Sequence, residues 1–327
     1  MIERIFRMYH LALLAALMIL ALVLPVDAQP ATEKTLSGHP SLQGLWNFST
    51  ATPMERPEEL AEKSTLTAEE AAEYEQRLAE RRRAGDSTSE TASLESRVSY
   101  EQAIWFERSD TLEQQRTSLI VDPANGRIPT VRPKASARSA LTQLLRRRHA
   151  HGPEDRGVSE RCLLGFNSGP PMTPSVYNNN MQLFQTSDHV VILNEMVHNA
   201  RIIPLDGRAH LPDQLTQWAG DSRASWDGDT LVILTRNFLG ETSFRGSSSN
   251  LHLVERFTLV DSATLRYEFT VSDHTTWSKP WTARVLMKRS NEPLYEYACH
   301  EGNYSMASSL SGARAIESSK SESTGTE

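Results

Sequence analysis

A histidine beside a carboxylate and an arginine is a common set of side chains for acid–base catalysis at neutral pH. The sequence offers this set where the apolar run Val190–Val197 ends, because Glu195 lies inside the run, His198 follows it and Arg201 stands on the next predicted strand. An extended strand would place Glu195 and His198 on opposite faces, with cross-strand neighbours within about 5 Å. The segment is a candidate acid–base site, and the alternative is a structural ion pair with a hydrogen-bonded histidine.

A second candidate site depends on the two cysteines. Cys162 and Cys299 are the only ones in the chain, and an isolated pair in an oxidising compartment is normally bridged. Their disulfide would bring His300 and Glu301 close to Arg161, so that titratable groups from distant parts of the chain would form one cluster. The alternative is a cluster of structural salt bridges around the disulfide.

Amide side chains near these segments are suited to orient a ligand. Tyr177, Asn179 and Asn180 stand immediately before a predicted strand, and amides provide paired donors and acceptors. Together with Arg201 and Arg161 they are the predicted ligand-binding residues. Asparagines also favour turns and strand entries, which is the structural alternative.

Chemistry at these sites would need no cofactor and would be of the hydrolase, isomerase or lyase type. We expect His300 or His198 to act as the base. Glu301 or Glu195 would orient it, and Arg201 with Asn179 would stabilise developing negative charge. No spacing matches a zinc signature such as H-E-x-x-H, so no metal is predicted. The sequence also lacks G-x-S-x-G, G-x-G-x-x-G and P-loop motifs.

Composition restricts the possible partners. The chain has 327 residues, of which 39% are hydrophobic and 23% charged, as in a globular protein with a sizeable core. A net charge of −7 argues against a nucleic-acid partner. The arginine runs 81–83 and 146–148 are interpreted as solvated helix faces.

Residues 1–28 have the pattern of a cleaved signal peptide. Arg4 and Arg7 precede the apolar run Leu11–Leu24, and small residues precede a cleavage site after Ala28. The run has about 14 residues, fewer than the roughly 20 that span a bilayer. We therefore predict a periplasmic or secreted protein without a stable membrane anchor after cleavage.

Most elements that would position these residues are strands. The predicted strands alternate apolar with polar residues and are separated by short turns rich in Asp, Gly and Ser. They are Met181–Thr186, Val190–Val197, Ala200–Leu205, Arg223–Trp226, Leu231–Asn237, Leu251–Leu259, Leu265–Val271 and Trp281–Lys288. The pattern predicts a mainly β fold, either an antiparallel up-and-down barrel or a strongly curled sheet, with peripheral helices.

We expect a single β-barrel-like domain over 41–306, preceded by a flexible mature N-terminus over 29–40. Helical insertions are predicted near 57–106 and 135–149. The serine-rich residues 307–327 have the composition of a disordered tail.

Two local sequence patterns within this domain predict particular elements, a helix start and a hairpin. Thr67 and Glu70 form a capping box that begins a helix, and Gly85 suits its end. Ser118–Val121 and Arg127–Val131 flank a Pro- and Asn-Gly-containing turn, which predicts a hairpin.

Several longer motifs carry a family resemblance: Leu42–Trp46, Thr117–Pro123, Gly152–Arg156, Glu160–Leu163, Gly169–Met172, Tyr177–Asn180, Ala200–Arg208, Gly220–Arg223 and Tyr297–Tyr304. Over nearly the whole mature chain, the sequence resembles a family of exported bacterial proteins of uncharacterised function. The resemblance implies no catalytic residues. A thinner resemblance to lipocalin-like barrels rests on Gly44-x-Trp46 and the number of strands.

The predicted function is binding of one small, largely hydrophobic molecule within the barrel, with or without cofactor-independent catalysis. The alternative is a non-catalytic periplasmic carrier or envelope scaffold. A cavity that reaches both His300 and an amide or arginine would favour catalysis. An interior filled by aromatic side chains would favour the scaffold. The sequence does not indicate an oligomeric state.

Overall fold

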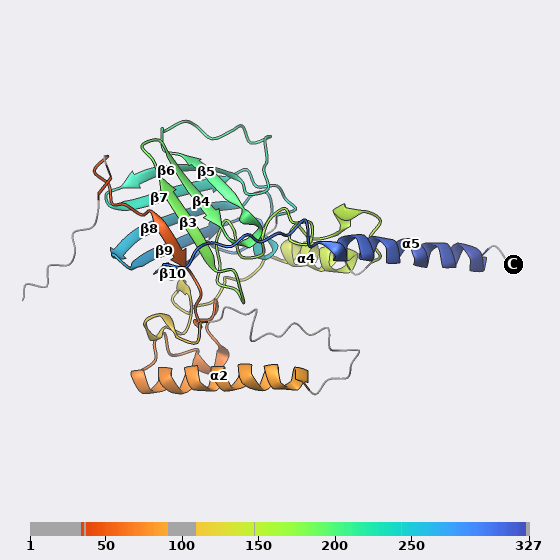
Figure 1. Ribbon diagram of the computed structural model, residues 1–327, viewed down its shortest axis with the longest axis horizontal. Helices are drawn as coiled ribbons and strands as arrows, with labels where there is room; N and C mark the ends of the chain where they lie inside the picture. The colour runs from red at the N-terminus through yellow and green to blue at the C-terminus, as the bar shows by residue number, and fades with distance from the viewer. Residues whose placement is uncertain (1–33, 36, 91–108, 147, 243, 325–327) are drawn as a thin grey trace, which may run out of the picture. The chain divides into compact units, whose positions relative to one another are not determined.

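In the part of the chain that the structure describes, ten strands form one antiparallel sheet (Figure 1). They are β1 (Gly44–Asn47), β2 (Ile120–Asp122), β3 (Asn180–Gln185), β4 (His189–Asn194), β5 (Ala200–Pro204), β6 (Asp221–Asp227), β7 (Thr230–Arg236), β8 (His252–Asp261), β9 (Thr264–Ser272) and β10 (Trp281–Ser290). The order is β5-β4-β3-β1-β10-β9-β8-β7-β6, and β2 pairs with another part of β10. The predicted mainly β, antiparallel fold is confirmed.

The computed structural model describes residues 34–324 except 36, 91–108, 147 and 243, without the side chains of 84–90 and 320–324. Residues Lys34–Glu327 form one unit. The predicted signal peptide and the part of the first predicted helical insertion over 91–106 lie outside the described residues.

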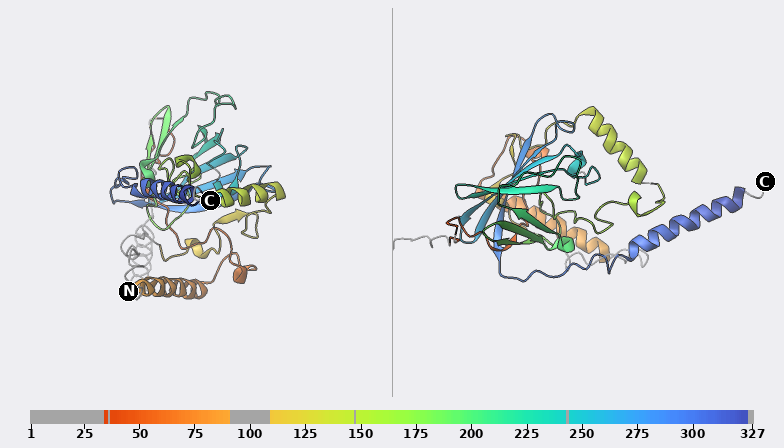
Figure 2. Two further views of the ribbon diagram at one scale, coloured as in Figure 1. Left: turned by 90° about the vertical axis from the view of Figure 1, so that its right-hand side faces the viewer. Right: turned by 90° about the horizontal axis from the view of Figure 1, so that it is seen from above.

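The sheet curls until its two edge strands, β5 and β6, contact each other (Figure 2). No backbone pairing between β5 and β6 occurs in the described sheet, so it is a strongly curled sheet and not a closed barrel. Side chains bridge the gap, because Arg201 of β5 donates to Ser222 Oγ of β6 at 3.1 Å.

Aromatic side chains fill the interior of the curled sheet. Alternate residues of β8, β9 and β10 face inward and are fully buried, including Phe257, Tyr267, Phe269 and Trp281. Consecutive ring centroids lie 4.7, 5.5 and 5.9 Å apart along this series. At these distances the rings pack against one another. An interior filled by aromatic side chains favours the scaffold alternative over a ligand bound within the barrel.

The helices are α2 (Ala68–Glu90), α4 (Pro133–Arg146) and α5 (Tyr304–Thr324). The predicted capping box at the start of α2 is confirmed, since Glu70 N donates to Thr67 Oγ1 at 3.2 Å and Thr67 N donates to Glu70 Oε2 at 3.1 Å. Among the described residues, no helix combines the length and apolarity needed to cross a membrane.

The C-terminal segment differs from the disordered tail predicted over 307–327, because α5 continues to Thr324. Its Arg314 donates to the backbone carbonyls of Ala150 and His151 at 3.0 and 2.7 Å, and Ala313 is buried. Serine-rich composition suggested disorder, whereas these contacts with a distant loop hold one side of the helix.

Two predicted strands differ in the structure. Arg127–Val131 is not a strand, and only Val131 makes an isolated bridge, to Trp277. Pro129 lacks the amide that a ladder needs. The predicted strand Val190–Val197 ends at Asn194 as β4.

A tight turn replaces the end of that predicted strand. Val197 and His198 have positive φ angles of 60° and 40°, within the short 3-10 segment η4 (Met196–His198). Strand alternation therefore does not extend to Glu195 and His198, and the expected assignment of their faces is wrong.

Candidate functional site

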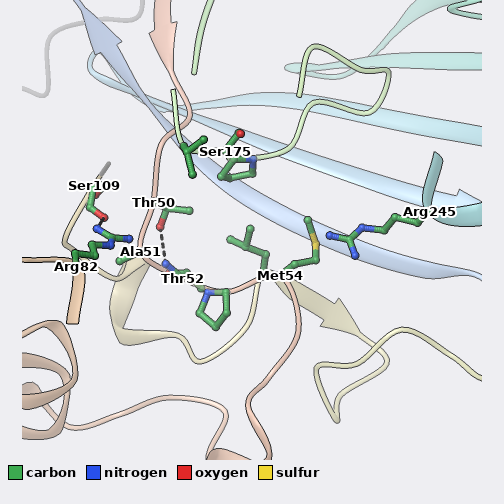
Figure 3. Close-up of a pocket in the computed structure, with 12 residues that line it drawn as sticks. Thr50, Ala51, Thr52, Met54, Arg82, Ser109, Ser175 and Arg245 are labelled. Atoms are coloured by element: carbon green, nitrogen blue, oxygen red, sulfur yellow. Dashed lines mark hydrogen bonds between the residues drawn. The ribbon is translucent and has the colours of Figure 1, made fainter. Parts of the chain in front are cut away.

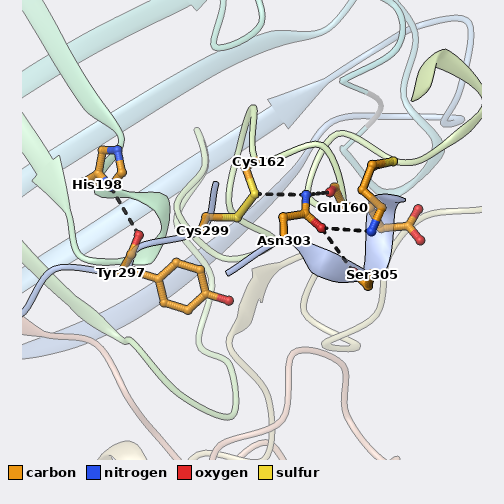
Figure 4. Close-up of a disulfide and its surroundings, with 8 residues drawn as sticks. Glu160, Cys162, His198, Tyr297, Cys299, Asn303 and Ser305 are labelled. Carbon is orange, nitrogen blue, oxygen red and sulfur yellow. Dashed lines mark hydrogen bonds between the residues drawn. A yellow bond between two sulfur atoms is a disulfide. The ribbon is translucent and has the colours of Figure 1, made fainter. Parts of the chain in front are cut away.

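The predicted disulfide between Cys162 and Cys299 is confirmed, with their Cα atoms 5.8 Å apart (Figure 4). Cys162 is buried with Met196 and Val197, and Tyr177 packs against this cluster. The bridge therefore joins the loop before β3, the turn after β4 and the segment after β10.

The disulfide does not assemble the predicted cluster of charges. His300 and Glu301 are exposed, and neither side chain forms a hydrogen bond or ion pair with a residue that the structure describes. Arg161 instead pairs with Glu241 at 3.4 Å and lies 5.4 Å above the Trp218 ring. The catalytic roles of His300 and Glu301 stay predictions.

A small pocket of about 280 Å³ lies beside the disulfide. Asn303 lines this pocket, and its Nδ2 donates to the Glu160 carbonyl at 2.7 Å (Figure 4). The Glu160 carboxylate is already bound by Arg156 at 2.7 Å and by the Gly157 amide at 2.8 Å. Most polar groups at this pocket are therefore engaged within the protein.

Glu195 and His198 take separate partners. Glu195 is buried and accepts from Asn180 Nδ2 at 2.8 Å, and Asn180 Oδ1 accepts from Asn47 at 2.8 Å. His198 is exposed, with Nδ1 3.3 Å from the Tyr297 carbonyl oxygen. Each residue links neighbouring segments, and their acid–base role stays a prediction.

Arg201 lies inside the curled sheet and forms a buried ion pair with Glu255, with N–O distances of 3.1 and 2.6 Å. Tyr267 donates its hydroxyl to Glu255 at 2.8 Å and accepts from the Met172 amide at 3.1 Å. Burial, followed by the charge of Glu255, raises the pKa of Tyr267 well above its usual value. This buried triad joins β5, β8, β9 and the loop before β3.

Sequence reasoning missed Glu255 and Tyr267 as partners of Arg201. A signal was present, because Glu255 occupies an inward position between Leu253 and Phe257 of the same strand. A carboxylate in an apolar row needs a buried cation or donor.

Asn179 closes the loop before β3. Its Oδ1 accepts from the Ser175 amide at 2.7 Å, and its Nδ2 donates to the Ser175 carbonyl at 2.9 Å. Asn167 Nδ2 binds the carbonyls of Tyr177 and Asn178 at 3.1 and 3.0 Å. The loop thus has a defined conformation, and ligand contacts of Tyr177, Asn179 and Asn180 stay predictions.

This loop forms one wall of a second pocket, of about 440 Å³, which we call the arginine pocket (Figure 3). The other walls come from the segment after β1, Ser109, the residue before β2 (Leu119), α2 and the short segment η5 (Phe244–Gly246). None of the lining residues given for it belongs to a strand. Sequence reasoning missed this pocket, because its walls come from separate parts of the chain.

Two guanidinium groups face the arginine pocket. Arg82 pairs with Asp110 and donates to the Ser109 carbonyl at 3.0 Å. Arg245 forms no hydrogen bond or ion pair with a described residue. Its guanidinium lies 6.0 Å from the Phe244 ring centroid, and Figure 3 shows it pointing toward Met54.

The arginine pocket is electropositive, because none of its described lining residues is acidic. Desolvation lowers the pKa of Arg245, and the charge of Glu55 opposes this shift. A guanidinium nevertheless stays protonated at neutral pH. Arg245 is exposed, so the pocket offers a solvent-accessible positive charge that an anionic group can bind.

Glu113 donates its backbone amide to Thr52 Oγ1 at 2.8 Å, and its carboxylate accepts from the Leu286 amide of β10 at 2.9 Å. Burial raises the pKa of Glu113 to about 7, against the opposing effects of the Leu286 hydrogen bond and Arg116. The folded protein therefore retains a proton on Glu113 that the unfolded chain releases as pH rises above about 4.5.

We expect Glu113 to make the protein less stable as pH rises from about 4.5 to about 7. Relative to Glu113→Gln, the wild-type unfolding free energy should fall by at most about 3 kcal/mol across this window. Urea denaturation of both proteins at several pH values would measure the difference. A pH-independent difference would contradict the raised pKa.

Within the described ranges, no three histidine, cysteine or carboxylate side chains are placed to hold a metal ion.

No protein-family model matches this chain, and no curated protein matches it. The resemblance to exported bacterial proteins stays a prediction. Among solved structures, the chain is similar to an SAHS (secretary abundant heat soluble) protein from Ramazzottius varieornatus, with 14% identity and a TM-score of 0.24 over 34% of this chain and 70% of that chain. It is also similar to a mutant of the fluorescent protein UnaG, with 13% identity and a TM-score of 0.21 over 35% and 72%. Neither similarity bears on function.

Proposed function

We propose that this protein is an exported, non-catalytic carrier that binds one small amphipathic molecule with an anionic group in the arginine pocket. The observation that carries the proposal is the charge of that pocket: Arg245 faces it without a hydrogen-bonding or ionic partner among the described residues, and no described lining residue is acidic. A carboxylate or sulfonate would supply the missing partner.

The rest of the pocket suits the apolar part of such a ligand. Its volume of about 440 Å³ is in the range of small-molecule sites. Hydroxyl groups of Thr50 and Ser175 lie among apolar lining residues. The apolar residues are Ala51, Pro53, Met54, Leu119, Pro174 and Val176.

Carrier activity is favoured over catalysis by the positions of the acid–base candidates. None of His300, Glu301, His198 and Glu195 lines the arginine pocket. The packed aromatic interior also supports a ligand bound outside the lumen, in contrast to the ligand within the barrel expected from the sequence. Export is supported by the disulfide and by the signal-peptide pattern in the sequence.

Binding of anilinonaphthalene sulfonate, an amphipathic anion, would test this proposal by fluorescence titration. We expect the folded protein to bind the probe and Arg245→Met to weaken binding about tenfold, because one charge-assisted contact is worth roughly 1.4 kcal/mol or more. Decanoate should displace the probe, and decanol at the same concentration should not.

Arg81→Met is the matched control, because Arg81 is exposed on α2 next to Arg82 but does not line the pocket. It should bind the probe like the wild type. Near-ultraviolet circular dichroism of each variant would show that the fold is intact. Unchanged affinity in Arg245→Met, or equal displacement by decanol and decanoate, would refute the proposal.

A further inference from the structure

Helix α4 presents an uncovered row of leucines. Leu141, Leu144 and Leu145 are 55%, 55% and 46% exposed, and their spacing of three and four residues places them on one side of the helix. Buried contacts are few, since Ala135 is the one residue of α4 that is buried. A 14-residue helix is only marginally stable without packing. The leucine face therefore lacks the cover that an apolar helix face normally has.

Another side of α4 is attached to the protein. Arg138 donates to the Gly246 carbonyl at 2.8 Å and to Thr276 Oγ1 at 3.0 Å, and Ser139 faces Gly246. At about 100° per residue, Leu144 is half a turn from Ala135 and Leu141 is nearly half a turn from Ser139, whereas Leu145 lies only about 20° from Arg138. Leu141 and Leu144 therefore point away from Ala135 and Ser139, and Leu145 forms the edge of the leucine face beside Arg138.

Positive charge surrounds this face. Residues Arg132–Arg148 contain six lysines and arginines and no acidic residue, in a chain with a net charge of −7. Lys134 and Arg148 are exposed, and neither side chain forms a hydrogen bond or ion pair with a described residue. The arginine run 146–148 therefore belongs to a longer basic segment that carries an apolar face.

We propose that α4 docks on a membrane surface that contains anionic lipids, with Leu141, Leu144 and Leu145 inserted at the interface. Helices that combine an apolar face with lysine and arginine lie in the plane of the interface and bind more tightly as anionic lipid increases. The complementary charge favours a lipid surface. The association is peripheral and uses no residue that lines the arginine pocket.

Flotation with vesicles would test this proposal on the mature protein. We expect the wild type to bind phosphatidylcholine vesicles that contain phosphatidylglycerol, and to bind pure phosphatidylcholine vesicles much less. Leu141→Ser/Leu144→Ser should lower the affinity at least about tenfold, because two apolar side chains no longer enter the interface. Lys134→Gln/Arg148→Gln should weaken binding to the anionic vesicles only.

Leu215→Ser is the matched control, because Leu215 is 54% exposed but lies outside α4. It should bind vesicles like the wild type, and all variants should keep the wild-type urea midpoint. Absence of vesicle binding, or equal binding by wild type and the double leucine variant, would overturn the proposal. So would a wild-type dimer that becomes monomeric in that variant without any vesicle binding, since a second copy would then cover the face.

Discussion

Cys162→Ala/Cys299→Ala is expected to lower the free energy of unfolding by about 4–5 kcal/mol, the largest loss that we predict. The two residues are 137 positions apart in sequence, so the bridge restricts a long loop of the unfolded chain. The chain-entropy model assigns most of the stabilisation to this restriction. Urea denaturation of the wild type and the double variant would measure the change.

Wild-type protein unfolded under reducing conditions provides the control for this experiment, because it lacks the bridge but keeps both thiols. Its stability should approach that of the double variant. A loss below about 1 kcal/mol would show that the bridge contributes little beyond what packing around Cys162 already supplies. Thiol titration of the unreduced, denatured wild type should find no free thiol among its two cysteines.

The buried ion pair between Arg201 and Glu255 carries the second large prediction. The Glu255 and Arg201 side chains are 0% and 4% exposed. Glu255→Gln should destabilise the protein by about 3–5 kcal/mol, because it leaves the Arg201 charge buried without a counter-ion. Chemical denaturation would measure this loss.

An apolar double replacement separates the cost of an unpaired charge from the value of the pair. Arg201→Met/Glu255→Leu should recover most of the stability lost in Glu255→Gln, since it removes both charges. The exposed pair Arg256–Asp227, at 2.7 Å, is the control, and Arg256→Met should cost less than about 1 kcal/mol. A double variant less stable than Glu255→Gln would contradict this explanation.

Local patterns in the sequence predicted much of the fold. Alternation of apolar and polar residues identified strands such as Leu265–Val271, which lies within β9. Thr67 and Glu70 identified the start of α2. Such signals succeed because the hydrogen bonds and burial period that cause them involve residues close together in the chain. The disulfide was predicted from the cysteine count and from the oxidising compartment that the signal-peptide pattern suggests.

Side-chain partners were less predictable. Glu195 and His198 were assigned to faces of a strand, but the positive φ of Val197 ends that regularity. The sequence identified Arg201 as important but did not identify Glu255, its partner 54 residues later. Pairing of charges across a curled sheet depends on strand register and sheet curvature. The alternation of apolar and polar residues along one strand does not encode either of them.

By itself, the sequence determined most of the strand segments, the cap of α2 and the pairing of the only two cysteines. The tertiary structure alone decided that the sheet stays open between β5 and β6, that the aromatic residues fill its interior, and that Arg245 meets residues 50–54 and 174–176 around one pocket. The physical reason is that strands and caps arise from interactions among near neighbours, whereas a pocket lined by loops depends on contacts between segments far apart in the chain.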